Sequence, residues 1–70
     1  MRHTELAKDL GQALRQAREL QHLSQLRLAL DAHVQQCSIC HLEKGKLNVT
    51  IDTLLDICQA LHLKVMLVRE

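Results

Sequence analysis

The stretch SQLRLALDAHVQQCSICHLE, residues 24–43, contains two short amphipathic segments separated by about three residues. Ser24 is a suitable N-cap, because its hydroxyl can accept a bond from a free backbone N–H at a helix start. The apolar spacing predicts one helix over about residues 25–32 and another over residues 36–43. The residues expected to face the core are Leu28, Ala29 and Ala32 in the first helix and Ile39 and Leu42 in the second.

Upstream, residues 6–20 have the spacing of one amphipathic helix. Gly11 lies inside this helix, where glycine costs about 1 kcal/mol relative to alanine. We therefore expect another element to pack closely against Gly11. The predicted apolar stripe consists of Leu6, Leu10, Ala13, Leu14, Ala17 and Leu20.

Downstream, Gly45 follows the second short helix and suits a left-handed C-cap. Thr50 is a good N-cap for a further helix that ends near His62, with Asp52 favourably placed in its first turn. Cys58 lies on the apolar side of this helix, and a buried free thiol behaves as a small hydrophobe. The sequence therefore predicts Cys58 as a core residue.

The C-terminal segment differs from the rest of the chain. Residues 63–69 form a nearly continuous apolar run with β-branched members, which predicts a short strand. A lone strand in a helical chain requires a partner, and two copies can pair across a two-fold axis. The dimerisation residues expected on this strand are Val65, Met66, Leu67 and Val68.

The composition of the 70 residues supports one all-α domain. The chain has no aromatic residue, no proline and two glycines, so aromatic base-stacking modules and turn-rich β folds are excluded. We predict a four- to five-helix bundle over about residues 5–62, followed by the strand over about residues 63–69. A domain below about 70–80 residues rarely gains more than about 3–5 kcal/mol from its core, so we expect dimerisation.

Two short helices joined by about three residues have helix-turn-helix spacing. The outer side of the second helix carries Gln36, whose amide both donates and accepts and so matches the adenine edge. Lys44 and Lys46 follow this helix directly and are expected to meet phosphates. The pattern therefore predicts a DNA-reading surface.

Five ordered segments extend this pattern: LSQ (23–25), LA (28–29), VQQCSI (34–39), LEKGK (42–46) and TLLDICQAL (53–61). Together they resemble the Cro/C1-type (XRE) helix-turn-helix family over about residues 6–63. The resemblance implies a lambda-repressor-like bundle and a homodimeric repressor that binds a palindromic operator in double-stranded DNA. It also implies an internal ion pair between Arg18 and Glu43. The positions that it implies for DNA contact are Gln25, Gln36, Cys37, Ser38, His41, Lys44, Lys46 and Asn48. Gln35 is a further candidate, and so is Arg27, which stands where the family often has an acidic residue and is expected to reach a phosphate.

Two features refine or depart from that pattern. His33 stands where the family usually has the turn glycine, which predicts either backbone strain at this position or an altered turn. The strand-like end further resembles HipB-type antitoxins. That narrower likeness implies an autoregulated toxin–antitoxin operon and a HipA-like kinase toxin as partner.

Alternative hypotheses start from Cys37-Ser38-Ile39-Cys40-His41, which matches the Cys-x-x-Cys-His pattern of c-type haem attachment. Met66 is then the candidate distal ligand. The same side chains with Cys58 or a water give four zinc ligands, and the cysteine pair alone is a thioredoxin-like dithiol. A further alternative is an interaction module that keeps the fold without binding DNA. The favoured interpretation assigns these residues to the recognition helix, with no cofactor and no metal.

No apolar run reaches the length of a membrane span, and the polar N-terminus lacks a signal-peptide core. We therefore expect a cytoplasmic protein without a membrane partner. No nucleophile–base arrangement or phosphate loop is present in the sequence, so we also expect no enzymatic activity and no catalytic residue.

Overall fold

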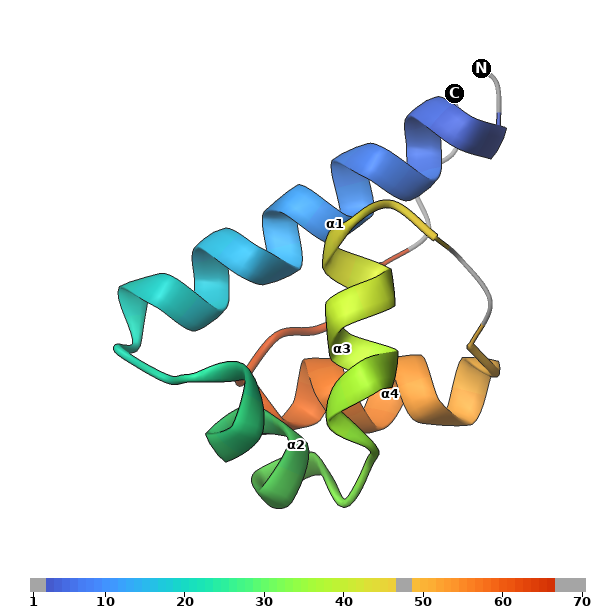
Figure 1. Cartoon of the computed structure of the whole chain (residues 1–70). Coiled ribbons are helices and arrows are strands. Elements are labelled where there is room, and N and C mark those ends of the chain that lie inside the picture. The colour runs from blue at the N-terminus through green and yellow to red at the C-terminus, as the bar shows by residue number, and fades with distance from the viewer. Residues whose placement is uncertain (1–2, 47–48, 67–70) are drawn as a thin grey trace.

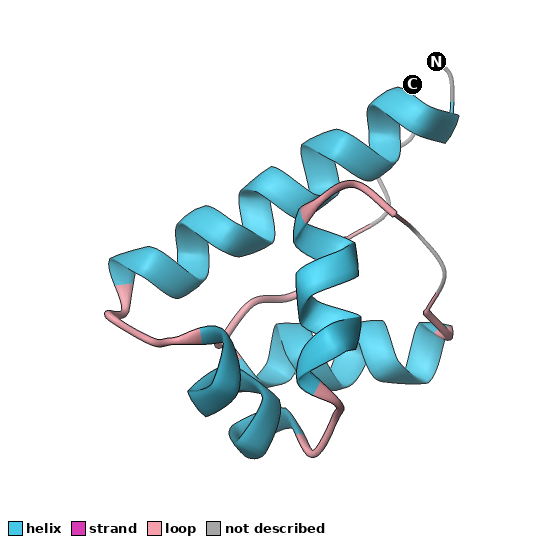
Figure 2. Ribbon diagram, viewed as in Figure 1, coloured by secondary structure: helices cyan, strands magenta, loops and turns pink. Residues whose placement is uncertain are grey.

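The computed structural model describes residues 3–46 and 49–66. Four helices occupy this part of the chain: α1 (His3–Leu20), α2 (Gln25–Ala32), α3 (Gln36–Glu43) and α4 (Ile51–Ala60). Figure 1 shows α1 as a long diagonal helix, with α3 crossing in front of α4 and α2 at the lower edge. The all-helical prediction is confirmed for the described residues, as the colouring of Figure 2 makes plain.

Two N-caps begin helices where the sequence predicts them. The Ser24 hydroxyl accepts a hydrogen bond from the Arg27 backbone N–H at 3.0 Å, and α2 begins at Gln25. The Thr50 hydroxyl accepts from the Thr53 N–H at 3.2 Å, and α4 begins at Ile51. Each bond satisfies one of the backbone donors that a helix start leaves free.

A single hydrophobic core lies between the helices, because α1 packs on α3 while α2 contacts both α3 and α4. Cys58 joins this core with 4% of its surface exposed, so the prediction of a core cysteine is confirmed. Burial raises the pKa of the Cys58 thiol, since desolvation disfavours the thiolate. The largest fully buried side chains are Leu28, Ile39, Leu42, Ile57 and Leu61.

The predicted apolar stripe of α1 is wrong at its edges. Leu6 is 51% exposed, Leu20 is 81% exposed and Ala13 also faces solvent. The buried side of α1 instead runs through Ala7, Gly11 and Leu14. Two of these three residues are small, and their size allows the backbones of α1 and α3 to approach each other. A prediction based on the spacing of leucines cannot detect packing of this kind.

Gly11 is where the two backbones come closest. A Cβ atom added at Gly11 would overlap the Leu42 carbonyl oxygen and lie 3.2 Å from the Glu43 carbonyl oxygen. The expectation of a close neighbour at Gly11 is therefore confirmed, and that neighbour is the last turn of α3.

The predicted C-terminal strand is not supported. Residues 63–66 form no strand, and the predicted dimerisation positions Leu67 and Val68 lie outside the described residues. A strand needs a neighbouring strand for its backbone hydrogen bonds, and residues 3–46 and 49–66 provide none. Instead, the Leu63 N–H donates to the Cys58 carbonyl at 2.8 Å and closes the end of α4.

Four described turns share one way of ending a helix. His22, His33, His62 and Gly45 all have positive φ angles, of 57°, 57°, 60° and 86°. The residue after each donates its N–H back across the last helical turn, as Val34 does to the Ala29 carbonyl at 3.0 Å. This is the Schellman arrangement, in which glycine is the usual left-handed residue. The predicted strain at His33 is confirmed, and His22 and His62 carry the same strain.

Replacing His33 with glycine is expected to raise the free energy of unfolding by about 0.5–1 kcal/mol. Glycine adopts a positive φ without a Cβ penalty, which outweighs its larger conformational entropy in the unfolded chain. Urea denaturation of the variant measures the change. His33→Ala is the matched control, because it removes the same imidazole while keeping the Cβ. Equal stability of the two variants would contradict the backbone explanation.

Candidate nucleic-acid interface

The helix-turn-helix unit consists of α2, the turn at residues 33–35, and α3. Ala29 and Ala32 of α2 are buried together with Ile39 and Leu42 of α3. The two helices are thus fixed by their inner sides, and their outer sides remain free for other contacts. Figure 1 shows α3 presenting its outer side at the front of the molecule.

The outer side of α3 carries the predicted base-reading residues Gln36, Cys37 and His41, together with the DNA-contact candidates Gln35 and Ser38. Gln35, Gln36 and Cys37 are exposed, while Ser38 and His41 are half-buried. The Cys37 thiol donates a weak hydrogen bond to the Gln35 Oε1 at 3.4 Å. The structure thus places these five residues on or beside one short helix, as the sequence predicts.

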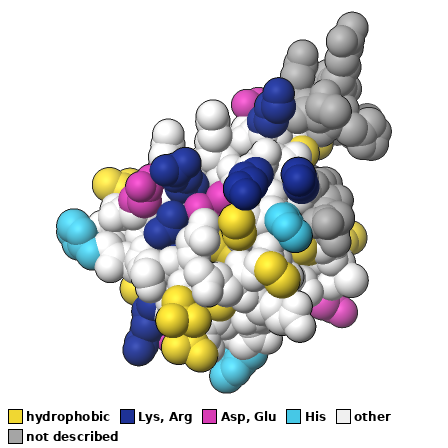
Figure 3. Space-filling model, viewed as in Figure 1, with side chains coloured by type: hydrophobic (Ala, Val, Ile, Leu, Met, Phe, Trp, Pro, Cys, Tyr) yellow, Lys and Arg dark blue, Asp and Glu magenta, His cyan; other side chains and the backbone are white. Residues whose placement is uncertain are grey.

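A basic cluster, defined here as Lys8, Lys44 and Lys46, lies at the C-terminal end of α3. Lys44 and Lys46 are exposed and flank Gly45. A Cβ atom on Gly45 would lie 3.2 Å from the Cα of Lys8, so α1 places a third lysine beside this turn. Figure 3 shows Lys and Arg side chains gathered on this face of the molecule.

Lys8 is the functional candidate that the sequence prediction missed. It lies three residues before Gly11, and residues at this spacing share one side of a helix. Because Gly11 is expected to pack against another element, Lys8, on the same side of α1, is expected to lie beside that element too. The signal was therefore present in the sequence but depended on knowing which element contacts Gly11.

The α2 candidates are differently placed. Arg27 is on the surface, and its Nε lies 3.2 Å from the Asp31 carboxylate one turn later. Gln25 is half-buried, and its Nε2 donates to the Glu43 carboxylate at 3.1 Å. The first turns of α2 and α3 carry no acidic residue, which suits helix starts that meet an anion. The last candidate, Asn48, lies outside the described residues.

The predicted ion pair between Arg18 and Glu43 is confirmed. The Arg18 Nε and Nη2 donate to the two carboxylate oxygens of Glu43 at 2.7 and 3.0 Å. The Arg18 Nη1 also donates to the Leu23 carbonyl at 2.7 Å. The hydrogen bond to Glu43 raises the pKa of Arg18 above its usual value. Together with Gln25, this network ties α1, the following loop, α2 and α3 together.

The cysteines and histidines of the metal hypotheses differ in burial and, among the described residues, form no set of three or more metal ligands. Cys37 is exposed, Cys40 is half-buried and Cys58 is buried in the core. Within the described part of the chain, no group of three or more His, Cys, Asp or Glu side chains is arranged to hold a metal ion. Across the same residues, no helix has both the length and the apolar character that a membrane span requires.

Comparison with known proteins agrees with this geometry. A family model described as Helix-turn-helix matches residues 14–66. The restriction-modification controller protein C.AhdI from Aeromonas hydrophila has a similar solved structure, with a TM-score of 0.77 and 29% sequence identity. The match covers 83% of this chain and 88% of that one. No curated protein sequence matches significantly.

Proposed function

Because the chain belongs to the Helix-turn-helix family, we propose that it is a transcriptional regulator that binds a specific site in double-stranded DNA. The observation that carries this proposal is the outer side of α3, which is polar, exposed and bordered by the basic cluster. A DNA-binding helix needs base-reading groups flanked by phosphate-binding groups, and this side of α3 offers both. The proposed activity is binding alone, without catalysis.

In the proposed complex, α3 enters the major groove. Gln36 lies at the first position of α3, from which its amide would bond the N6 and N7 groups of an adenine. His41 would reach a second base or a phosphate, and the basic cluster would contact the phosphate backbone. Gln25 and Arg27 at the start of α2 would contact phosphates on the other side of the groove.

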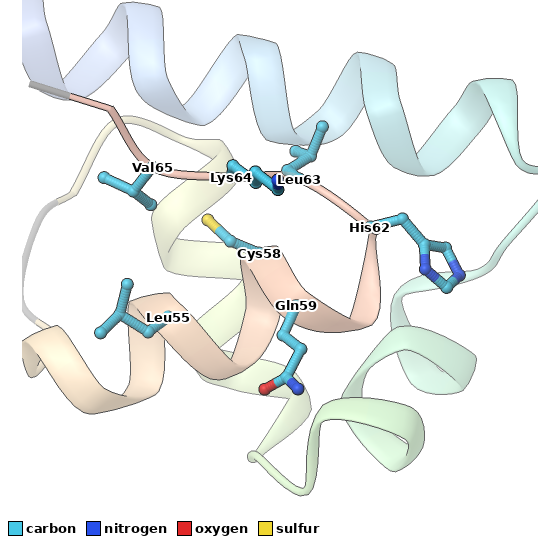
Figure 4. A pocket seen from close by; sticks show the side chains of 7 residues that line it. All are labelled: Leu55, Cys58, Gln59, His62, Leu63, Lys64 and Val65. Carbon is cyan, nitrogen blue, oxygen red and sulfur yellow. The ribbon is translucent and has the colours of Figure 1, made fainter.

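We propose that the DNA-binding species is a homodimer. Leu55, Leu63 and Val65 line a surface hollow where the segment after α4 runs back alongside that helix (Figure 4). Their exposed fractions of 45%, 39% and 54% leave apolar area for a second copy to cover. Two α3 helices would then lie about 34 Å apart on a palindromic operator, one turn of B-DNA.

The regulatory outcome that we favour is repression, because a bound dimer blocks access to a promoter. The likeness to C.AhdI supports a second candidate within the same class, a controller of restriction-modification genes. The toxin–antitoxin role with a HipA-like toxin stays a prediction, and the strand that motivated it is absent from residues 63–66.

Fluorescence anisotropy of the reduced, EDTA-treated protein tests DNA binding. We expect DNA from upstream of its own gene to bind about 10³-fold or more tightly than a scrambled duplex. Gln36→Ala should weaken specific binding by about 1–3 kcal/mol, whereas Lys46→Ala should weaken binding to all sequences and lower the salt slope by about 1.

Lys46→Arg is the matched control for Lys46→Ala, because it changes the side chain at the same exposed position and keeps its positive charge. Its affinity and salt slope should equal those of the unmodified chain. Equal, weak binding to the upstream and scrambled duplexes by a folded dimer would reject the proposal. That result would favour an interaction module that keeps the fold.

A further inference from the structure

Two thiols lie one turn apart on α3. Cys37 is exposed and Cys40 is half-buried, and both are free. Their three-residue spacing places them on one side of the helix. The proposed DNA contacts place Cys37 on the DNA-facing side of α3 and do not use Cys40, so they give the two thiols no role as a pair.

Helix geometry brings this pair within reach of a disulfide. Residues three apart in an α-helix have Cα atoms about 5 Å apart, within the range of roughly 4.4–6.8 Å that disulfides span. Their Cβ atoms are about 5–6 Å apart, whereas a disulfide requires roughly 3.5–4.5 Å. A bond between Cys37 and Cys40 therefore needs a local contraction of this turn of α3.

The first turn of α3 is well suited to such a contraction. Its N-cap, Gln35, makes no side-chain capping bond, in contrast to the hydroxyl caps that begin α2 and α4. The Ser38 N–H bonds the Gln35 carbonyl at 3.1 Å, and the side-chain hydrogen bond within this turn is the weak one from the Cys37 thiol to the Gln35 Oε1. Forming the disulfide replaces that weak bond. Distortion there breaks no side-chain cap.

We propose that Cys37 and Cys40 are a redox modification site at which a peroxide produces a reversible disulfide that weakens DNA binding. The effect on DNA rests on the proposed function, whereas formation of the disulfide does not. Contracting the turn moves Gln36 and Cys37 away from the positions that would meet base edges. Cys58 takes no part, because it is buried in the core and its thiol has a raised pKa.

The chemistry needs only the two thiols and the peroxide. The Cys37 thiolate attacks one peroxide oxygen, which forms an S–O bond, breaks the O–O bond and releases hydroxide. The Cys40 sulfur then attacks the sulfur of the resulting Cys37 sulfenic acid, which forms the S–S bond and breaks the S–O bond; the oxygen on Cys37 leaves as water with the Cys40 proton. Two thiols and one hydrogen peroxide thus give one disulfide and two waters. A dithiol reductant reverses the modification.

Tryptic mapping after hydrogen peroxide treatment tests the disulfide directly. Cleavage after Arg27 and Lys44 leaves both cysteines in the peptide 28–44, and Cys58 falls in the peptide 47–64. We expect the peptide 28–44 to lose the mass of two hydrogen atoms, while the peptide 47–64 keeps a free thiol. Cross-linked peptide pairs or an unchanged peptide 28–44 would overturn the proposal.

DNA affinity provides the second measurement. The oxidised protein should bind its specific duplex at least tenfold more weakly, with full recovery after dithiothreitol. Cys40→Ala is the matched control, because it keeps Cys37 but has no partner for the disulfide; it should stay within twofold of its untreated affinity. If Cys40→Ala and the unmodified chain lose DNA affinity equally after peroxide treatment, the proposal that the disulfide weakens DNA binding is overturned. If the reduced protein binds no specific DNA, the proposed function fails. The peptide masses then still show whether the Cys37–Cys40 disulfide forms.

Discussion

Replacing Glu43 with alanine is expected to lower the free energy of unfolding by about 3 kcal/mol. This is the lower end of the range for removing one partner of a buried ion pair, because this pair is largely but not fully buried. The side chains of Arg18 and Glu43 are only 12% and 6% exposed, so water cannot replace the lost carboxylate. The carboxylate also accepts a bond from Gln25, and its removal leaves donors from two helices without their acceptor.

The matched control is Glu19→Ala, which breaks the exposed pair between Arg15 and Glu19. That pair is 60% and 55% exposed at its two side chains, and its loss should cost no more than about 1 kcal/mol. Urea denaturation compares the two variants, with trimethylamine N-oxide added if Glu43→Ala is largely unfolded in water. Similar losses in the two variants would show that burial of the Arg18–Glu43 pair is not what stabilises the domain.

Replacing Gly11 with alanine is expected to cost about 3 kcal/mol, although alanine is the better helix former by about 1 kcal/mol. The added methyl group would overlap the Leu42 carbonyl oxygen, which belongs to the helix backbone and cannot rotate away. Overpacking of this kind costs about 1–3 kcal/mol or more. Because the neighbour is a backbone atom, we place Gly11→Ala at the upper end of this range.

Gln12→Ala is the control for Gly11→Ala, because Gln12 is the next residue of α1 and is exposed. This variant should be as stable as the unmodified chain, or slightly more stable, by thermal denaturation. A Gly11→Ala protein as stable as Gln12→Ala would mean that α1 and α3 can separate without cost. The amide exchange rates of α1 and α3 would then locate the relaxation.

Local chemistry explains why the helix boundaries were predictable from the sequence. Ser24 and Thr50 act through bonds to residues three positions away, and Gly45 through its own φ angle. These effects need no knowledge of the fold, and α2 and α3 begin and end where predicted. The candidate residues on α3 were predictable for the same reason, since a short helix with two buried positions fixes which side faces out.

Features that depend on which helices pack together were harder to predict from the sequence. The buried side of α1 follows Ala7 and Gly11, and small residues give little hydrophobic signal. Lys8 joins the basic cluster only because that side of α1 packs on α3. The C-terminal strand was predicted from β-branched residues alone, yet β propensity yields a strand only where a partner strand is available.

The three left-handed histidines have a consequence for how this domain can evolve. His22, His33 and His62 lie in different turns, so the gains from replacing them with glycine should be nearly additive, about 1.5–3 kcal/mol in total. Such a gain approaches the stability expected for a domain of this size. New residues on α3 that read a different operator tend to destabilise the fold. A lineage that first acquires these glycines can therefore tolerate changes in recognition that would unfold the present chain.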